Sequence, residues 1–286
     1  MLIRDILNEA TLRFAEAGIP SPRLDAEVLL SFCLGCDRLE FFKNPSLPVS
    51  EKSLASFQKL AARRMKWEPV AYITGHKEFW SFVLEVDKNV LIPRPDTEVL
   101  VEEALNVCKQ IDSAEIKILD IGTGSGAIAL ALAKEIRQAR VVATDISEAT
   151  LAIAKKNAHN LRLDSQIKFL EGNLFEPVCD LFDIIISNPP YIEEAEYEEL
   201  PAGVKDYEPP EALLAGAQGT DFYQKIINEA PGYLKRNGWL LLEIGATQRE
   251  RVVNIAEDSG QYCDIGVRKD YTGLPRVVKA RRKISG

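Results

Sequence analysis

The spacing of hydrophobic and polar residues changes along this chain. In the first 68 residues it is the spacing typical of α-helices. Apolar side chains recur every three to four residues in "IRDILNEATLRFAEAG", "SPRLDAEVLLSFCLG" and "SEKSLASFQKLAARRMKW", which predicts three helices. Gly18 is a stop signal, Ser21 and Ser50 are candidate N-caps, and Pro22 suits a first helical turn. We therefore predict a small helical domain over residues 1–68, serving either as packing support or as a module that recognises a partner.

The period shortens to two in residues 69–95. The stretch "EPVAYITGHKEFWSFVLEVDKNVLIPRP" alternates apolar and polar side chains and carries a turn signal at "VDKNV". This pattern predicts a β-hairpin linker. A helix is expected to begin directly afterwards, in "IPRPDTEVLVEEAL", with Asp96 or Thr97 as its cap.

Residues 96–286 alternate between strand and helix patterns, which indicates an α/β domain with a parallel sheet covered on both faces. The tail "CDIGVRKDYTGLPRVVKARRK" differs, because it contains two strand patterns joined by a loop at "YTGLP". Such a late hairpin would add an antiparallel strand at the end of the sheet. The predicted strands are "KILDIG", "ARVVATDI", "IKFLEGN", "FDIIISN" and "GWLLLEIG", and the predicted helices are "GAIALALAKEI", "SEATLAIAKKNAHNL", "DFYQKIINEAPGYL" and "TQRERVVNIAEDSG".

Composition and charge narrow the class of protein. A hydrophobic content of 46% and a charged content of 27% are ordinary for a soluble globular protein of 286 residues. The formal net charge of −8 disfavours general attraction to nucleic acid or to an anionic membrane. Apolar runs such as "AIALALA" are far too short to span a membrane, and the amino terminus lacks the pattern of a secretory signal. We therefore expect a cytoplasmic protein.

The cysteines suggest neither a disulfide framework nor a metal site. There are five, an odd number spread along the chain. Cys33 and Cys36 form a C-x-x-C pair, but the sequence offers no second pair and its two histidines are His76 and His159. A zinc site would need two further ligands, so we expect both cysteines to end an amphipathic helix and expect no metal.

A glycine-rich turn is expected to carry a nucleotide-like cofactor. In "ILDIGTGSGAIALALA", Gly122, Gly124 and Gly126 stand between a strand and a helix, where they allow a sharp turn and close approach to a ligand. Asp145 ends the next strand, nineteen residues after Gly126, where an acid can accept hydrogen bonds from both ribose hydroxyls. The spacing fits a G-x-G-x-x-A dinucleotide pattern, and it equally fits the D-x-G-x-G-x-G pattern, starting at Asp120, of methyltransferases that use S-adenosylmethionine (SAM). A tight turn with an ordinary capping Asp is the structural alternative.

The stretch "ISNPPYIEE" distinguishes between these cofactors. Proline cannot extend the strand "FDIIIS", so a rigid turn follows its carboxyl end, where ligands bind in open α/β sheets. The side-chain oxygen of Asn188 and the backbone oxygen of Pro189 are two acceptors for one planar –NH2 group, Pro190 keeps the turn rigid, and Tyr191 offers an aromatic wall. An amide or aromatic nitrogen attacks poorly unless its N–H bonds are polarised. The pattern therefore favours methylation of nitrogen over hydride transfer.

Several stretches resemble one family, the release factor glutamine methyltransferases. These are "PVAYITGHKEFW", "LIPRPDTEVLVE", "DIGTGSGAIALALA", "SNPPYI", "YEPPEALLAGAQGTDFY", "LLLEIGATQ" and "DYTGLPRVV", which follow in order from about residue 65 to the end. The resemblance implies a Rossmann-like class I methyltransferase domain, with a mostly parallel seven-stranded sheet and one late antiparallel strand. It implies methylation, with SAM, of the glutamine side-chain amide in the Gly-Gly-Gln motif of peptide chain release factors.

The resemblance also assigns residues to roles. The glutamine is expected to be held by Asn188, Pro189, Pro190 and Tyr191. Leu174 is aliphatic where some relatives carry an aromatic residue, so packing against adenine is expected to be weaker there. The residues expected to bind the cofactor are Asp120, Gly122, Thr123, Gly124, Ser125, Gly126, Asp145, Asn173, Leu174 and Asn188.

Other interpretations stay open at this point. Similar turns occur in enzymes that methylate exocyclic amines of DNA or RNA bases, although the acidic balance counts against them. The loose glycine pattern alone permits an NAD-dependent oxidoreductase, and a non-catalytic binding module is the remaining possibility. Arg94, Thr97 and Glu98 either shape the cofactor pocket or fix the hinge. Residues 193–208 hold seven acids and one lysine, which form a solvated loop or attract a basic protein surface; we expect a monomer.

Overall fold

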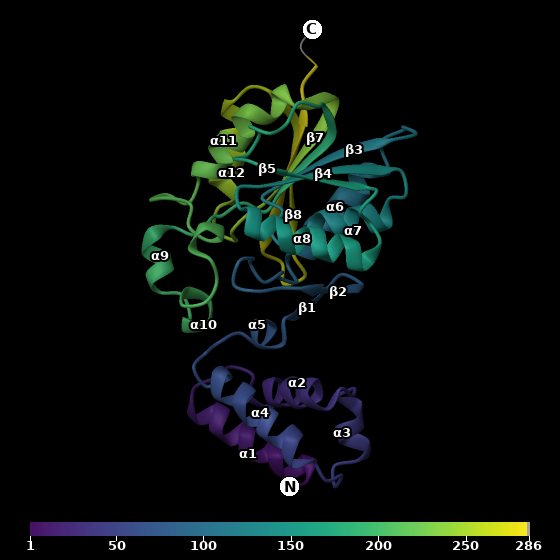
Figure 1. The fold of residues 1–286 in the computed structure, drawn as a ribbon. Coiled ribbons are helices and arrows are strands. Elements are labelled where there is room, and N and C mark those ends of the chain that lie inside the picture. Colours follow the sequence, from purple (N-terminus) through teal and green to yellow (C-terminus); the bar gives the residue numbers. More distant parts are fainter. Residues whose placement is uncertain (285–286) are drawn as a thin grey trace. The chain divides into compact units, whose positions relative to one another are not determined.

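The computed structural model describes residues 1–284, and the chain divides into two compact units (Figure 1). The helical unit comprises Met1–His76 together with Pro201–Tyr207. The sheet unit comprises Lys77–Leu200 and the chain from Glu208 onward. The chain therefore leaves the sheet unit after Leu200, contributes a short segment to the helical unit, and returns.

The helical unit is built on the three amphipathic helices that the sequence predicts. Their apolar faces bury a common core that includes Phe14, Leu30 and Phe57, each at most 3% exposed. The Ser50 hydroxyl accepts a hydrogen bond from the Ser53 backbone N–H, so this predicted N-cap is confirmed. The helices of this unit are α1 (Ile3–Glu16), α2 (Pro22–Leu34), α3 (Leu39–Lys43), α4 (Glu51–Arg64), α5 (Val70–Thr74) and α10 (Ala202–Lys205).

The segment Pro201–Tyr207 contacts the backbone of the helical unit at Lys66 and Trp67. The Tyr207 hydroxyl donates to the Lys66 carbonyl oxygen at 2.8 Å. Gly203 packs so closely that an added Cβ would lie 3.0 Å from the carbonyl oxygen of Trp67. A segment distant in sequence is thereby part of this fold.

A two-stranded hairpin follows α5, and its two strands are joined at a turn that the sequence did not predict. The strands β1 (His76–Phe79) and β2 (Phe82–Glu85) are joined through Trp80, whose φ of 56° lies in the left-handed region. Its backbone N–H donates to Glu98 Oε1 at 2.7 Å, and its indole N–H donates to Glu135 Oε1 at 2.8 Å. The turn predicted at "VDKNV" is present after β2, where the Val90 backbone N–H donates to the Asp87 carbonyl oxygen at 3.1 Å. The turn at Trp80 was not predicted, because these long-range bonds compensate a conformation that a tryptophan rarely adopts.

The sheet unit contains the mostly parallel sheet with a late antiparallel strand, which confirms the predicted fold class. Its strand order is β5-β4-β3-β6-β7-β9-β8. The pairs from β5 through β7 are parallel, and β9 inserts between β7 and β8 antiparallel to both. The strands are β3 (Ile116–Ile121), β4 (Ala139–Asp145), β5 (Ile167–Glu171), β6 (Phe182–Ser187), β7 (Leu234–Glu243), β8 (Tyr262–Lys269) and β9 (Pro275–Arg282).

Helices cover both faces of this sheet (Figure 1). On one face, α11 and α12 enclose an apolar cluster that includes Leu240, Tyr223 and Val252, each at most 2% exposed. On the other face lie α6, α7 and α8 (Figure 1). The helices are α6 (Thr97–Cys108), α7 (Ala127–Glu135), α8 (Glu148–Leu161), α9 (Glu194–Glu198), α11 (Asp221–Glu229) and α12 (Arg249–Asp258), with 3-10 turns at η1 (Pro210–Ala212) and η2 (Ala230–Gly232).

The strand order creates a switch point between β3 and β6. From β3 the chain proceeds outward through β4 and β5, and from β6 it proceeds the other way through β7. Ile121 and Ser187 pair across these central strands, so the glycine turn and the "NPPY" turn leave the sheet side by side. This is the position at which open α/β sheets bind ligands. Within residues 1–284, every helix is too short or too polar to cross a membrane.

Candidate active site

The glycine turn after β3 is fixed by backbone hydrogen bonds and open on one side. The N–H groups of Gly122 and Thr123 both donate to the Thr144 carbonyl oxygen at 2.9 Å. Gly122 and Gly124 have φ values of +70° and +58°, and no atom of the described residues lies within 4 Å of a Cβ added to either. A ligand can therefore approach the backbone closely at these two positions.

Gly126 serves packing instead. A Cβ added there would lie 3.1 Å from Leu130 Cδ1 and 3.3 Å from Ala154 Cβ. Its φ of +85° also disfavours a side chain. This glycine allows α7 to begin close against α8, while the preceding two leave room for a ligand.

Asp145 lies against the glycine turn, as the spacing predicts. Its Oδ2 accepts from the Gly124 backbone N–H at 3.0 Å, and its Oδ1 accepts from the Ser147 backbone N–H at 3.1 Å. Burial raises the pKa of this carboxyl group above its ordinary value, and these backbone bonds oppose the shift. Each carboxylate oxygen has a second lone pair, so Asp145 keeps the capacity to accept two further hydrogen bonds.

Asp120, Thr123 and Ser125 lie beneath the turn rather than on its open side. Asp120 is fully buried, and its Oδ2 accepts from the Thr123 hydroxyl at 2.6 Å. Its Oδ1 has no hydrogen-bond partner within residues 1–284, and burial raises the pKa of Asp120 to about 7. The Thr123 and Ser125 side chains are at most 5% exposed. These three side chains shape the turn from inside.

Asn173 and Leu174 follow β5 next to the carboxyl end of β4. The Gly172 backbone N–H donates to the Asp145 carbonyl oxygen at 3.0 Å, which holds this segment beside the acid. Leu174 has a φ of +49°, and its side chain packs against the apolar cluster under α11 and α12. Asn173 is exposed. The structure thus brings both residues near Asp145, with Leu174 partly turned into the core.

Asn188 begins the "NPPY" turn at the centre of the site. The Ser187 hydroxyl donates to the Ile121 carbonyl oxygen at 2.7 Å and joins the ends of β6 and β3. The Asn188 side-chain N–H donates to the Thr97 hydroxyl oxygen at 3.3 Å. Pro189 is buried, so the turn is rigid beside the glycine turn.

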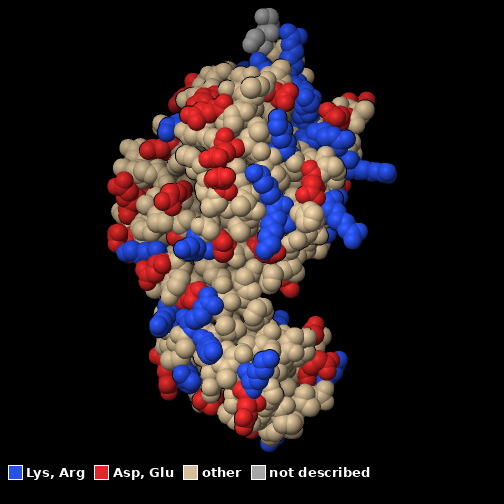
Figure 2. All heavy atoms as spheres, viewed as in Figure 1, with Lys and Arg blue, Asp and Glu red and all other residues tan. Residues whose placement is uncertain are grey.

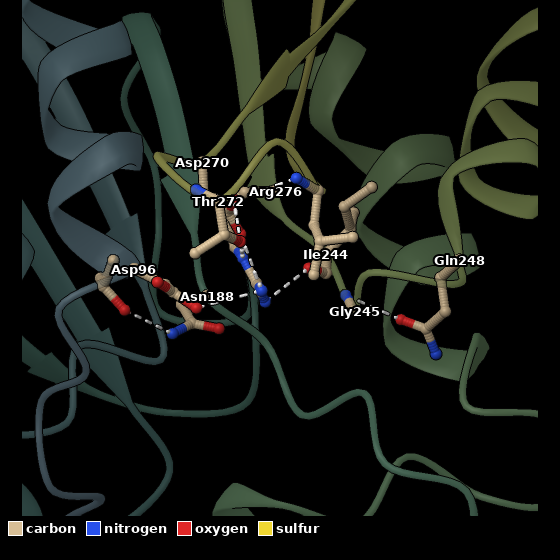
Figure 3. A network of polar contacts seen from close by, with 10 residues as sticks. Asp96, Asn188, Ile244, Gly245, Gln248, Asp270, Thr272 and Arg276 are labelled. Carbon is tan, nitrogen blue, oxygen red and sulfur yellow. Dashed lines mark hydrogen bonds and ion pairs between the residues drawn. The ribbon is translucent and has the colours of Figure 1, made fainter.

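Gln248 holds the far end of the turn. Its Oε1 accepts from the Gly245 backbone N–H at 3.1 Å (Figure 3). Its Oε1 also accepts from the Tyr223 hydroxyl at 3.2 Å, and its Nε2 donates to the Tyr191 carbonyl oxygen at 2.8 Å. Burial raises the pKa of the Tyr191 phenol above its ordinary value. Tyr191 is therefore a neutral aromatic surface, and its backbone is held by Gln248, the residue before α12.

A buried arginine, Arg276, links three segments near Asn188. Arg276 contacts Asp96 at 3.0 Å and Asp270 at 3.2 Å, and it donates to the Ile244 carbonyl oxygen at 3.3 Å (Figure 3). Asp270 also accepts from the Thr272 hydroxyl, and this bond is the main cause that lowers its pKa to about 2. The loop "DYTGLP" is thereby attached to the segment before α6.

Sequence reasoning missed Glu243, Gln248 and Arg276. Glu243 is 1% exposed at the carboxyl end of β7, and burial raises its pKa to about 7, while the nearby Thr97 hydroxyl opposes this shift. A signal existed, because "LLLEIG" ends an otherwise apolar strand with one acid. Thr97 therefore contacts both Asn188 and Glu243.

The two flanking residues weighed with Thr97 have other partners. Arg94 pairs with Glu208, a glutamate that is 2% exposed. Glu98 accepts from the Trp80 backbone N–H. Through these contacts, Arg94 and Glu98 fix the segment between the hairpin and α6.

The fold and these two turns define a class I, SAM-dependent methyltransferase, and comparison with known proteins agrees. Residues 5–75 match the PrmC N-terminal domain family, and residues 97–201 match the methyltransferase small domain family. The chain is 43% identical over 280 residues to a release factor glutamine methyltransferase of Geobacter sulfurreducens, covering 98% of this chain and 96% of that protein. It is 40% identical over 281 residues to the protein of that name from Rhodopirellula baltica, covering 97% and 95%. The chain belongs to the release factor glutamine methyltransferase family.

Solved structures share the fold at low identity. The 16S rRNA N2 G1207 methyltransferase of Thermus thermophilus, in complex with AdoMet and guanosine, superposes with a TM-score of 0.53 at 19% identity, covering 73% of this chain and 50% of that one. The ribosomal protein L11 methylase of Lactobacillus delbrueckii superposes with a TM-score of 0.50 at 20% identity, covering 70% and 84%. Both similarities concern the sheet architecture.

Proposed function

We propose that this chain transfers the methyl group of SAM to the side-chain amide nitrogen of the glutamine in the Gly-Gly-Gln motif of peptide chain release factors. Membership of the family supports the reaction. The observation that carries the proposal is the position of Asn188, whose N–H group is directed to Thr97 beside the glycine turn. Its Oδ1 is then left to accept from a substrate amide. We place the reaction in the cytoplasm, where release factors act.

The residues at the carboxyl ends of β3, β4 and β5 fit SAM. Gly122 and Gly124 leave open space over the turn, which a Cβ at either position would fill. Asp145 has the acceptor capacity for two ribose hydroxyls. Asp120, Thr123 and Ser125 are proposed to support the turn from below. When bound, SAM supplies a methyl group that is made electrophilic by its positively charged sulfur.

The protein's own contribution is to orient and polarise the glutamine. The amide lone pair is delocalised, so the nitrogen gains nucleophilicity when acceptors attract both N–H hydrogens and stabilise the positive charge that develops on nitrogen. Asn188 Oδ1 and the Pro189 carbonyl oxygen are these two acceptors, and Tyr191 forms a wall against the flat carboxamide. The reaction forms a nitrogen–carbon bond, breaks a carbon–sulfur bond whose electron pair stays on sulfur, and releases one proton from nitrogen.

Charge argues against a nucleic-acid substrate. The segment that leaves the site after Tyr191 carries seven acids and one lysine between residues 193 and 208. Figure 2 shows acidic side chains gathered over the segment that contains α9. A phosphate backbone would be repelled there, whereas a basic protein surface would be attracted. This distribution favours a protein over DNA or RNA as the substrate.

The experiment incubates the chain with SAM labelled in its methyl group and with a release factor, or with the same factor whose Gly-Gly-Gln glutamine is changed to alanine. We expect label on the first factor and none on the second. Asn188→Ala should lower the transfer rate about 100-fold or more while the SAM dissociation constant changes little, because the side chain acts on the glutamine. Equal labelling of both factors, or normal turnover by Asn188→Ala, would contradict the proposal.

A further inference from the structure

A buried carboxyl group lies beside Asn188 without an assigned role. In the sheet register Ser187 pairs with Leu242, so Asn188, which follows β6, is next to Glu243, which ends β7. Glu243 is 1% exposed, and its Oε2 has no hydrogen-bond partner in the described part of the chain. A carboxylate is costly to bury, so a residue of this kind at the edge of an active site calls for a functional explanation.

Thr97 connects the two side chains. Its hydroxyl lies close to the Glu243 carboxyl group and lowers the pKa of that group, and its oxygen accepts from Asn188 Nδ2 at 3.3 Å. A hydroxyl has one proton to donate, and an ionised carboxylate can accept but not donate. An ionised Glu243 attracts the Thr97 proton, so the Thr97 lone pairs face Asn188. Thr97 can then accept a hydrogen bond from the Asn188 –NH2 group, but it has no proton left to donate to the Asn188 oxygen.

We infer that Glu243 and Thr97 are positioning residues that orient the Asn188 side-chain amide, so that its oxygen rather than its –NH2 group faces the glutamine to be methylated. The inference rests on the proposed function and adds two residues to those that determine how the glutamine amide is bound. The two ends of an asparagine amide have nearly the same shape, so packing cannot select between them. A directional hydrogen-bond chain ending in a group that only accepts does select.

Protonation of Glu243 would reverse the direction of the hydrogen bonds from Glu243 through Thr97 to Asn188. A protonated Glu243 can donate to Thr97, whose own proton can then turn to the Asn188 oxygen, which places an –NH2 group against the substrate –NH2. Burial raises the pKa of Glu243 to about 7, and the Thr97 bond and the nearby arginines oppose the shift. The charged and titratable groups around Glu243 are Asp96 and Arg94 before α6, Tyr191 after β6, Tyr223 on α11 and Arg276 on β9.

Two substitutions of matched size at Thr97 test the hydrogen bond. Thr97→Val keeps the shape and removes the hydroxyl, whereas Thr97→Ser keeps the hydroxyl and removes a methyl group. We expect Thr97→Val to lower kcat for release factor methylation about 10- to 100-fold, with an unchanged SAM dissociation constant, and Thr97→Ser to stay within about twofold of the unmodified chain. If Thr97→Val is normal, or if Thr97→Ser is the more impaired variant, Thr97 acts by packing and the inference is wrong.

The pH profile tests Glu243. At saturating SAM and release factor, kcat of the unmodified chain should fall as the pH is lowered from about 8 to about 6, as Glu243 takes up a proton. Glu243→Gln cannot ionise and carries a donor as well as an acceptor, as the protonated acid does, so its kcat should stay low from about pH 6 to about pH 8 and show no acid limb. Full activity of this variant near pH 8 would contradict the inference. An unchanged acid limb in Glu243→Gln would overturn the role of Glu243. If the unmodified chain labels no release factor at all, the proposed function fails instead.

Discussion

Glycines with the same backbone conformation have different roles in this chain. Gly124 in the turn after β3 has a φ of +58°, and Gly35 at the end of α2 has a φ of +64°. At both positions an added Cβ meets no atom of residues 1–284 within 4 Å. The energetic cost of a side chain is therefore backbone strain in each case, about 1–2 kcal/mol. The difference is that Gly124 lies in the proposed cofactor site.

This pair allows strain to be separated from ligand binding. We expect Gly124→Ala and Gly35→Ala to lower the melting temperature by similar amounts, because both force alanine into the left-handed region. Gly124→Ala should also weaken SAM binding at least about tenfold, since its methyl group enters the space that the cofactor needs. Calorimetric titration with SAM measures this. Equal SAM affinity in the two variants would mean that the cofactor does not approach Gly124.

At the scale of elements, the sequence predicts what is local or strongly periodic. The runs "KILDIG" and "FDIIISN" are apolar enough to be buried strands, and they lie at β3 and β6. The turn at Trp80 was missed because its left-handed conformation is stabilised by hydrogen bonds to Glu98 and Glu135, which are distant in sequence. Glu243 was missed for a similar reason, since its importance follows from the neighbour that the register of β6 and β7 gives it.

The contact between β2 and α8 depends on one buried amide. Asn157 Oδ1 accepts from the Glu85 backbone N–H at 2.7 Å, and its Nδ2 donates to the carbonyl oxygens of Glu85 at 3.0 Å and Ser125 at 2.9 Å. Asn160, one helical turn later, donates to the partly exposed Glu85 carboxylate at 2.8 Å. The first residue therefore joins the hairpin and the glycine turn to α8, while the second makes a surface contact.

We expect Asn157→Ala to lower the free energy of unfolding by about 2–4 kcal/mol, because three backbone groups lose their partner. Asn160→Ala should cost less than about 0.5 kcal/mol, as is usual for a surface contact. Urea denaturation of the full chain measures both. A similar loss in the two variants would show that the buried bonds of Asn157 are replaced by water.

At the scale of the whole molecule, two buried carboxyl groups link stability to pH. Burial raises the pKa of Asp120 and Glu243 to about 7, from ordinary values of 3.8 and 4.5. Between about pH 5 and pH 7 the folded chain keeps protons that the unfolded chain has lost, so this contribution to stability is present at low pH and is lost as the pH rises through about 7.

The urea midpoint of the SAM-free chain should therefore fall from about pH 5.5 to about pH 7.5. The variant Asp120→Asn with Glu243→Gln should lose most of this slope, and each single substitution should remove part of it. The comparison between chains cancels the general effect of negative net charge. Parallel pH profiles for the unmodified and doubly substituted chains would contradict the assignment.

Recognition of a whole release factor requires surface beyond the reacting glutamine, and the helical unit offers apolar side chains for it. Phe32 near the end of α2 is 50% exposed, and Leu39 and Phe42 of α3 are 61% and 69% exposed. Exposed apolar groups of this kind suit a protein partner.

Leu39→Ser with Phe42→Ser should raise KM for the release factor at least about fivefold, while SAM affinity and kcat at saturating factor stay unchanged, because the cofactor and the glutamine bind elsewhere. Leu181→Ser, which changes a 50% exposed leucine of the sheet unit, is the matched control. If KM rises equally in the control, or does not rise in the double variant, the helical unit does not bind the factor through α3.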